Sequence, residues 1–397
     1  MALITPPLTL YVHFPWCVSK CPYCDFNSHA VQGELPAARY VAALAADLEV
    51  QAPQVAGRTV GSVFLGGGTP SLFAPADIAR VLEHARRHLA FAPDAEVTLE
   101  ANPGTIERGR FADYRDAGVN RVSLGAQSFD AAALRVLGRI HSPDETRLAA
   151  EELHSAGLAN FNLDLMYALP AQTRAAALDD IDAALALAPA HLSHYQLTLE
   201  PGTLFAARPP ALPDDDTAHA MLEACVERLG AHRFARYEVS AYARAGRCCR
   251  HNVNYWEFGD YLGVGAGAHG KLTRGSDGDG DSGDDKAVVI RTTRPREPRR
   301  YMAAAGSTPE ARAVAPTELP FEFALNALRL CAGFTPALFE ARTGLAFETI
   351  APTVERLIGR ALLERAGDSC RPTGRGLAFL NDMLLEFLPE SRAGAAG

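Results

Sequence analysis

The stretch "YVHFPWCVSKCPYCDF" at residues 11–26 places Cys17, Cys21 and Cys24 directly behind an apolar segment that is typical of a strand. Three and then two residues separate the cysteines, and no fourth cysteine follows nearby. A structural zinc site usually has four closed ligands, and a 4Fe–4S cluster usually takes four cysteines. Three thiolates would leave one iron of such a cluster with an open coordination position, which favours chemistry over a purely structural role.

Two other interpretations of the cysteines stay open at this point. Zinc could bind the three thiolates together with Asp25, His13 or His29 as the fourth ligand. The cysteines could also be reduced surface thiols that hold no metal. Eight cysteines in 397 residues are too few for a disulfide scaffold. Their clustering in a reducing compartment therefore indicates a metal site.

Short apolar segments alternate with amphipathic helical patterns from residue 8 to about residue 240. We expect strands at 8–14, 62–67, 96–101, 121–127, 160–169 and 191–200, and helices that include 37–51, 75–89 and 177–188. This alternation predicts βαβ units around a parallel sheet. Six such units suit an open, partial (β/α)6 TIM-like barrel within the α/β class, because a closed barrel needs eight.

The chain divides into three expected regions: a barrel at 1–240, a connecting segment at 241–316 and a small C-terminal domain at 317–397. The connecting segment contains further strands and the acidic tract "RGSDGDGDSGDDK" (274–286), which we expect to be a disordered loop. The C-terminal domain resembles a winged-helix fold, with helices expected at 319–330, 335–344, 350–367 and 377–388 and a hairpin-like turn at 370–376.

Composition narrows the class of protein. The net charge of −9 argues against a nucleic-acid surface, so the C-terminal domain is expected to pack against the barrel or cover it. No run of 18 apolar residues occurs, and the N-terminal segment lacks basic residues and contains two prolines. We therefore expect a cytoplasmic protein with at most peripheral membrane contact. A homodimer is compatible with the sequence.

Polar residues and glycines follow the expected strands where each of them ends. "GGGTPS" (66–71) follows the second strand, Glu100 ends the third, Gln127 ends the fourth, and Asp164 lies on the fifth with Asn162 on the same face. The carboxyl ends of barrel strands build the active site in such folds. We expect these groups to share one mouth with the cysteines, and the glycines to let a ligand approach the backbone.

Taken together, "CVSKCPYC", "GGGTPS" and "LEANPGT" resemble the radical S-adenosylmethionine (SAM) superfamily. "VSLGAQSF", "LGRIHS" and "FNLDLMYALP" are similar to its oxygen-independent coproporphyrinogen III oxidase-like branch, over residues from about 8 to 385. The resemblance implies that Cys17, Cys21 and Cys24 hold a 4Fe–4S cluster. It also implies that SAM binds the fourth iron through its amino and carboxylate groups.

The same resemblance implies a set of SAM-binding residues. A first SAM would be lined by Tyr11, Tyr23, Gly67 and Glu100. The positions that contact a second SAM in the oxidases correspond to Gly68, Thr69, Gln127, Arg139 and Asp164. No residue is assigned a catalytic role.

Within the branch, two departures favour the HemW-type haem chaperones over the oxidases. The oxidases carry a fourth cysteine where this chain has Phe26, and they have an N-terminal arm that this chain does not match. "CRHNVNYW" (249–256) carries the HNxxYW signature of the chaperones, which implies haem contact by four residues. These residues are His251, Asn252, Tyr255 and Trp256. Cys249 and His269 are weaker candidates for haem iron.

The segment "GAGAHG" (265–270) formally satisfies GxGxxG, but it is not expected to open a helix after a βαβ strand. We interpret its glycines as sites of tight packing against the barrel.

The resemblance implies a haem chaperone that delivers haem to apo enzymes of a respiratory chain and carries a 4Fe–4S cluster and SAM. The alternative is an oxygen-independent coproporphyrinogen III oxidase, which decarboxylates propionates to vinyl groups, so whether the chain is an enzyme stays open.

Overall fold

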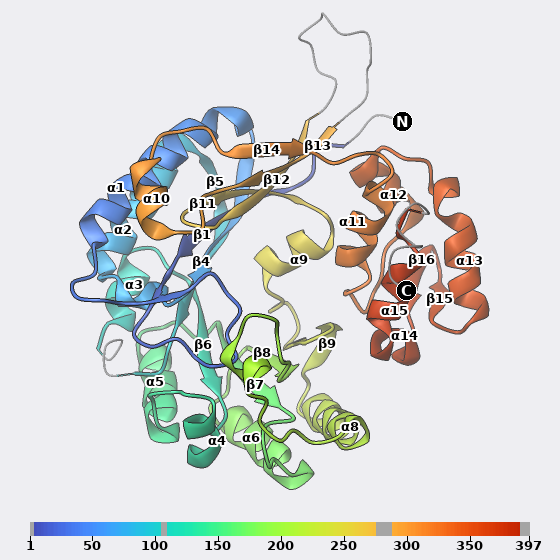
Figure 1. Ribbon diagram of the computed structural model, residues 1–397, viewed down its shortest axis with the longest axis horizontal. Coiled ribbons are helices and arrows are strands. Elements are labelled where there is room, and N and C mark those ends of the chain that lie inside the picture. Colours follow the sequence, from blue (N-terminus) through green and yellow to red (C-terminus); the bar gives the residue numbers. More distant parts are fainter. Residues whose placement is uncertain (1–3, 105–108, 275–287, 390–397) are drawn as a thin grey trace, which may run out of the picture.

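The computed structural model describes residues 4–104, 109–274 and 288–389. These residues form one 12-stranded sheet, which is flanked by helices, and a separate helical module near the C-terminus (Figure 1). The expected acidic loop lies outside the described residues apart from Arg274, and so do the last eight residues of the chain.

Six neighbouring strands of the sheet run parallel and confirm the expected partial barrel. In spatial order they are β1 (Leu8–Phe14), β4 (Thr59–Gly67), β5 (Ala90–Ala101), β6 (Arg121–Gln127), β7 (Phe161–Tyr167) and β8 (His191–Gln196). Residues of β1, β6 and β7 are buried on both faces, as expected for parallel strands that helices cover. The carboxyl ends of these strands form one rim.

Helices cover the outer face of this sheet (Figure 1). They are α1 (Ala37–Gln51), α2 (Pro75–His88), α3 (Phe111–Asp116), α4 (Ala131–Val136), α5 (Pro143–Ser155), α6 (Arg174–Ala186), α8 (Asp215–Ala231) and α10 (Pro298–Ala303). The short helix α7 (Leu204–Ala207) lies beside the cysteine loop instead, where the Phe205 N–H donates to the Pro22 carbonyl at 2.9 Å. The apolar faces of α1 and α2 contribute Leu44, Leu48, Ile78 and Leu82 to the main core. None of the helices in the described parts of the chain is long and apolar enough to cross a membrane.

The sheet extends beyond the six expected strands at both edges. On one side β11 (Asp260–Val264) pairs parallel to β1 and is followed by antiparallel β12 (His269–Arg274), β13 (Val288–Thr293) and β14 (Glu310–Ala313). On the other side lie β10 (Ala241–Ala243) and β9 (Ala235–Glu238). Sequence analysis did not identify β11 as parallel, because the strand is short and glycines interrupt its apolar pattern. The sheet therefore continues across residue 240.

A short helix, α9 (Arg250–Trp256), crosses the concave side of the sheet (Figure 1). At its N-terminus the Arg250 backbone N–H donates to Glu96 Oε1 on β5 at 2.9 Å. Farther along, Asn254 Nδ2 donates to the Asp260 carbonyl at 2.9 Å and to Thr9 Oγ1 at 3.2 Å. These bonds fix α9 against β5, β1 and β11 at once.

The C-terminal module has its own apolar core, and its order of elements is that of the expected winged-helix-like domain. It contains α11 (Leu319–Ala327), α12 (Pro336–Thr343), α13 (Ala351–Gly359), β15 (Leu363–Ala366), β16 (Ser369–Pro372), α14 (Gly374–Ala378) and α15 (Leu380–Leu385). The helix expected at 350–367 is too long. It ends at Gly359, Ala361 turns the chain with a positive φ of 55°, and the following residues pair as a hairpin.

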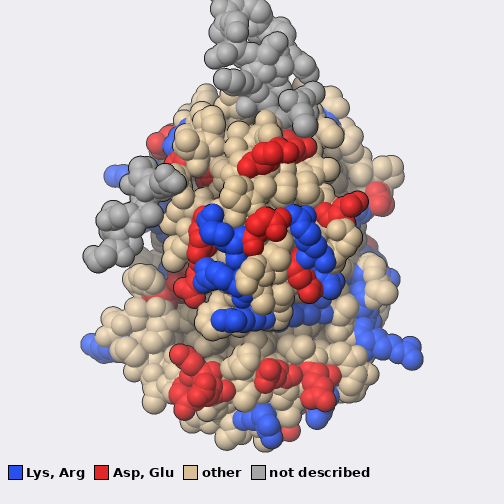
Figure 2. Space-filling model, turned by 90° about the vertical axis from the view of Figure 1, so that its right-hand side faces the viewer, with Lys and Arg blue, Asp and Glu red and all other residues tan. Residues whose placement is uncertain are grey.

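Charges of both signs alternate on the outer face of this module, which faces the viewer in Figure 2. The exposed ion pairs there include Arg360 with Glu386 at 2.6 Å and Arg371 with Glu364 at 2.7 Å. Paired opposite charges do not form the basic surface that attracts a phosphate backbone.

The glycine turn after β4 packs directly on the chain that leads to the cysteines. The Gly68 N–H donates to the Phe14 carbonyl, and the Thr69 N–H donates to the Trp16 carbonyl, both at 2.7 Å. A Cβ on Gly68 would lie 2.6 Å from the Trp16 oxygen, and one on Gly67 would lie 2.3 Å from the His13 ring. The turn therefore needs glycine at both positions to pack on this segment. Gly67 and Gly68 also line a cavity together with the three cysteines, and that they let a ligand approach the backbone stays a prediction.

Replacement of Gly68 by Ala is expected to lower the free energy of unfolding by about 1–3 kcal/mol, because the clash is with backbone that cannot rotate away. Gly61→Ala on the preceding strand β4 is the control, since the nearest atom to its Cβ is 3.8 Å away. Urea unfolding followed by circular dichroism measures both. Equal stabilities of the two variants would contradict this account of the turn.

Candidate functional site

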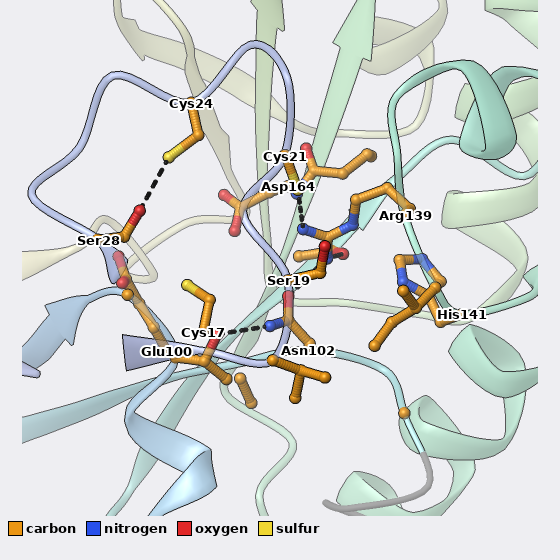
Figure 3. A pocket seen from close by; sticks show the side chains of 18 of the residues that line it. Cys17, Ser19, Cys21, Cys24, Ser28, Glu100, Asn102, Arg139, His141 and Asp164 are labelled. Carbon is orange, nitrogen blue, oxygen red and sulfur yellow. Dashed lines mark hydrogen bonds between the residues drawn. The ribbon is translucent and has the colours of Figure 1, made fainter. Parts of the chain in front are cut away.

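A cavity at the carboxyl ends of the parallel strands brings the three cysteines together with most of the expected SAM-binding residues (Figure 3). The residues of that set that line it are Tyr23, Gly67, Gly68, Thr69, Glu100, Gln127, Arg139 and Asp164. Tyr11 is the exception and lines a second, neighbouring cavity.

The cysteine loop is closed on itself by short-range contacts. At its base β2 (Trp16–Cys17) pairs with β3 (His29–Ala30). Across the loop, Lys20 Nζ donates to the carbonyls of Phe26 at 3.2 Å and Ser28 at 3.1 Å. These contacts hold the cysteine loop, which extends away from the sheet, in place over the cavity.

The thiols themselves have individual partners. Cys24 Sγ lies 3.5 Å from Ser28 Oγ, and Arg139 Nη1 donates to Cys21 Sγ at 3.7 Å. Burial raises the pKa of the Cys17 thiol above its ordinary value, so that a positive ion is needed to hold it as a thiolate. All three cysteines are free and half-buried.

The donor set fits an iron–sulfur cluster with one open iron better than a closed zinc site. Asp25, His13 and His29 are absent from the described lining of this cavity. Both ring nitrogens of His13 are already engaged, one with Tyr11 Oη and one with the Asn27 carbonyl, each at 2.9 Å. Zinc therefore has no evident fourth ligand among the residues that were considered for it.

Two carboxylic acids line the same cavity. Glu100 Oε2 accepts from the Gly67 N–H at 2.9 Å, and burial raises the pKa of Glu100 to about 7, with the nearby Asp164 adding to the shift. Asp164 accepts from Asn162 Nδ2 at 2.8 Å and from Ser123 Oγ at 3.1 Å, and burial raises its pKa as well. A cationic ligand in the cavity would stabilise both carboxylates.

Another part of the cavity wall is stabilised by residues to which sequence analysis assigned no role. Asn102 Nδ2 donates to Thr69 Oγ1 at 2.9 Å, and Arg139 donates to Asn102 Oδ1. Tyr195 Oη donates to Gln127 Oε1 at 2.8 Å. Gln127 has a positive φ of 65°, a backbone conformation that residues other than glycine rarely adopt. Asn102 lies within the quoted "LEANPGT" segment, whereas Tyr195 carries no sequence signal beyond its place near the end of a strand.

The second cavity adjoins the first, and Phe26, Gly67 and Glu100 line both. Its remaining wall is aromatic and basic and consists of Tyr11, His13, Asn27, Tyr255, Tyr261, Gly267, His269 and Arg296. His269 is exposed. A flat apolar ligand with anionic groups would find both stacking surfaces and positive charge here.

Of the four expected haem-contacting residues, Tyr255 alone is among the described residues that line this cavity. His251 is 3% exposed and lies behind it, with ring centroids 4.9 Å from Tyr255 and 5.1 Å from Phe64. Burial lowers the pKa of His251 to about 3, so that the ring is neutral, and its Nε2 has no hydrogen-bond partner within the described residues. A neutral, unpartnered imidazole nitrogen is able to accept a metal ion.

The other expected residues of this motif differ in their surroundings. Asn252 and Trp256 are half-buried, and the Arg329 guanidinium lies 4.4 Å from the Trp256 ring. Cys249 is buried, its thiol donates to Glu96 Oε1 at 3.7 Å, and burial raises its pKa to about 11. These contacts argue against the thiolate role considered for Cys249.

The interpretation of "GAGAHG" as a packing segment is confirmed. Gly265 and Gly267 have positive φ values of 106° and 78°. A Cβ would lie 2.5 Å from the His13 carbonyl at the first and 2.3 Å from Asn27 at the second. The segment leads into β12, not into a helix that could bind a dinucleotide.

Glu100→Gln is expected to reduce the pH dependence of stability of the cluster-free chain. A carboxyl whose folded pKa is raised stabilises the fold fully below its unfolded pKa of 4.5 and loses that contribution as pH rises through about 7. The loss is at most about 3 kcal/mol, and glutamine does not titrate. Urea unfolding between pH 5 and pH 8 measures it, with the exposed Glu223→Gln as control. An unchanged slope in Glu100→Gln would contradict the assignment.

Comparison with known proteins agrees with this geometry. A model of the radical SAM superfamily matches residues 11–184, and a model of the HemN C-terminal domain matches residues 314–379. The heme chaperone HemW of Escherichia coli is 47% identical over 385 residues, covering 97% of this chain and 99% of that protein. The heme chaperone HemW of Haemophilus influenzae is 43% identical over 389 residues, with 97% and 99% covered.

Among solved structures, the coproporphyrinogen III oxidase HemN from Escherichia coli is similar in fold. Its TM-score is 0.79 at 23% sequence identity, and the match covers 96% of this chain and 90% of that one. At this level of identity the match defines the architecture, and it leaves the activity to be decided by the site.

Proposed function

Because the chain belongs to the HemW family of the radical SAM superfamily, we propose that it is a haem chaperone that binds haem and passes it to haem-requiring enzymes. The observation that carries this proposal is the second cavity, whose aromatic, histidine and arginine wall adjoins the three-cysteine cavity. Recipients would be apo enzymes of a respiratory chain. All eight cysteines are free, which suits the reducing cytoplasm as the site of action.

Cys17, Cys21 and Cys24 would hold a 4Fe–4S cluster, and SAM would occupy the rest of that cavity. When bound, the cluster supplies an electron that can cleave a C–S bond of SAM. Glu100 and Asp164 would attract the positive charges of SAM, while Arg139 and Asn102 hold the wall against the cysteine loop. Burial of these groups excludes water and fixes the ligand in one orientation.

Haem would lie in the second cavity, with its ring against Tyr255 and its propionates toward Arg296. His251 would be the iron ligand from α9, reached when the Tyr255 ring rotates away from it. His269 at the rim is an exposed second imidazole in the same cavity. Asn252 and Trp256 lie on the same short helix but do not line this cavity, so their contact with haem would require α9 to move as well.

The enzymatic alternative, oxidation of coproporphyrinogen III, is less well supported. The position of the oxidases' additional cysteine is held here by Phe26, whose side chain is 61% exposed and borders both cavities. An apolar side chain at this point can neither bind a metal ion nor transfer a proton.

Single Cys→Ser changes at positions 17, 21 and 24 are each expected to abolish cluster binding, because each removes one of only three thiolate ligands. Iron and acid-labile sulfide are measured after anaerobic reconstitution. Cys248→Ser is the matched control, since that cysteine is also half-buried but lies outside the cavity. A full cluster in any one of the three variants would defeat the ligand assignment.

Anaerobic titration of the reconstituted protein with haem tests the function. We expect about one haem per chain without turnover of coproporphyrinogen III, and at least tenfold weaker binding by His251→Ala at unchanged iron content. His232→Ala, an exposed histidine next to α8, should bind as the wild type does. Unchanged haem affinity in His251→Ala would show that α9 has only a packing role. Turnover of coproporphyrinogen III together with weak haem binding would favour the oxidase function.

A further inference from the structure

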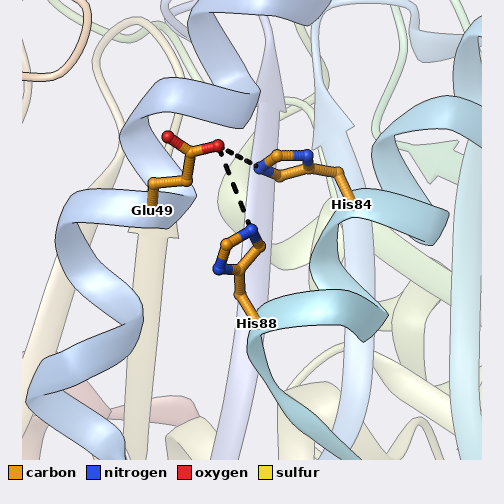
Figure 4. Close-up of side chains that lie close together, drawn as sticks. All are labelled: Glu49, His84 and His88. Atoms are coloured by element: carbon orange, nitrogen blue, oxygen red, sulfur yellow. Dashed lines mark ion pairs between the residues drawn. The ribbon is translucent and has the colours of Figure 1, made fainter.

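Three side chains with metal-binding atoms converge on the outer surface, away from both cavities (Figure 4). Glu49 lies in the last turn of α1, and His84 and His88 lie one turn apart on α2. The two imidazole rings point toward the carboxylate from the neighbouring helix, and one donor atom from each residue lies within 4.8 Å of the other two. None of the three is among the residues that line the cavities.

The distances between the donor atoms are close to those in a metal-binding site. His84 Nε2 is 3.2 Å from Glu49 Oε1, and His88 Nε2 is 4.0 Å from the same oxygen. Ligands that lie about 2.0–2.2 Å from a tetrahedral zinc ion are themselves about 3.3–3.6 Å apart. The His84–Glu49 pair is already close to this separation, and the donor atoms of His84 and His88 lie within 4.8 Å of each other. The His88–Glu49 pair reaches it by a small rotation, because Glu49 is 54% and His88 35% exposed.

The contact between His84 and Glu49 is not explained by a hydrogen bond. His84 Nε2 is buried and has no hydrogen-bond partner within the described residues, although it lies 3.2 Å from Glu49 Oε1. A buried ring nitrogen that faces a carboxylate without forming a hydrogen bond to it is placed to share a metal ion with that carboxylate.

Both helices also end at this point, and the negative ends of their dipoles favour a cation. Two arginines in the same turn of α2 disfavour a bound cation through their positive charge. Arg86 is turned toward the Phe91 ring, at 5.4 Å, and Arg87 is exposed to solvent, which screens its charge.

We propose that Glu49, His84 and His88 bind one divalent transition-metal ion of the zinc class, with solvent as the fourth ligand, in a site that joins α1 to α2. Two imidazoles and one carboxylate select zinc-class ions over magnesium or calcium, which prefer sites made of oxygen atoms. The bound ion would link the helices that follow β1 and β4, the two strands that precede the cysteine loop and the glycine turn.

Zinc binding to the full chain tests this proposal. The protein is first loaded anaerobically with its iron–sulfur cluster so that the three cysteines are occupied. If the wild type takes up no cluster, a chain with Cys17, Cys21 and Cys24 all changed to Ser is used in its place, because it has no thiols in the cavity that could bind zinc. The zinc test therefore does not depend on whether the proposed function is correct. Equilibrium dialysis against Zn²⁺ and elemental analysis should give one zinc per chain.

The variants Glu49→Gln and His88→Ala change exposed side chains, so folding is not at risk, and each should weaken zinc binding at least tenfold. The control is His219→Ala on α8, where His219 Nε2 lies 3.4 Å from Glu223 Oε1 with no third ligand among the described residues. Zinc should also raise the thermal unfolding midpoint of the wild type and of His219→Ala, but not that of Glu49→Gln.

Three results would overturn the proposal. They are wild-type zinc binding no tighter than millimolar, retention of zinc by Glu49→Gln and His88→Ala, or an equal loss in His219→Ala. The last result would mean that zinc binds exposed histidines in general.

Discussion

The arrangement of the site depends on one close backbone contact, the packing of the glycine turn after β4 against the end of β1. Hydrogen bonds from the Gly68 and Thr69 N–H groups to the Phe14 and Trp16 carbonyls leave no space for a side chain on Gly68. Cys17 follows directly on this segment, so its position is set by the turn. Thr69 then accepts from Asn102, which accepts from Arg139, which donates to Cys21. The turn is thereby linked to the far side of the cysteine loop.

A second set of buried polar contacts connects α9 to the wall of the three-cysteine cavity. Glu96 accepts from Cys249 and Arg250 at the start of α9 and lies 4.0 Å from the buried Arg121. Asn162, which donates to Asp164, accepts from the His191 ring at 2.7 Å. The other nitrogen of that ring lies 2.9 Å from Tyr237 Oη, which accepts from the Cys249 N–H at the start of α9. Removing one member of such a network would leave a polar group buried without its partner, which is costly. The helix with the haem signature and the carboxylates of the cavity are therefore held in fixed relative positions.

Much of the fold and of the first cavity could be predicted because the signals are local. The spacing of Cys17, Cys21 and Cys24 within one loop, and the short apolar strands between helical patterns, are read directly from neighbouring residues. The structure brings eight of the nine expected SAM-binding residues to one cavity, since strand ends of a parallel sheet share an edge. β11 was missed because its pairing with β1 joins residues about 250 positions apart, as in Tyr11 with Gly263. Tyr195 was missed because it belongs to no local pattern.

The sequence by itself determined the cysteine loop, the class of sheet and the family, because each of these rests on contiguous motifs or on a periodicity within a few residues. Only the tertiary structure decided how deeply each side chain is buried. It placed His251 behind Tyr255, moved Tyr11 to the second cavity, and filled the space above the glycines with His13 and Trp16. It also brought Glu49 from one helix to His84 and His88 on another. Burial and such contacts depend on how distant segments pack, and no local pattern of residues encodes that packing.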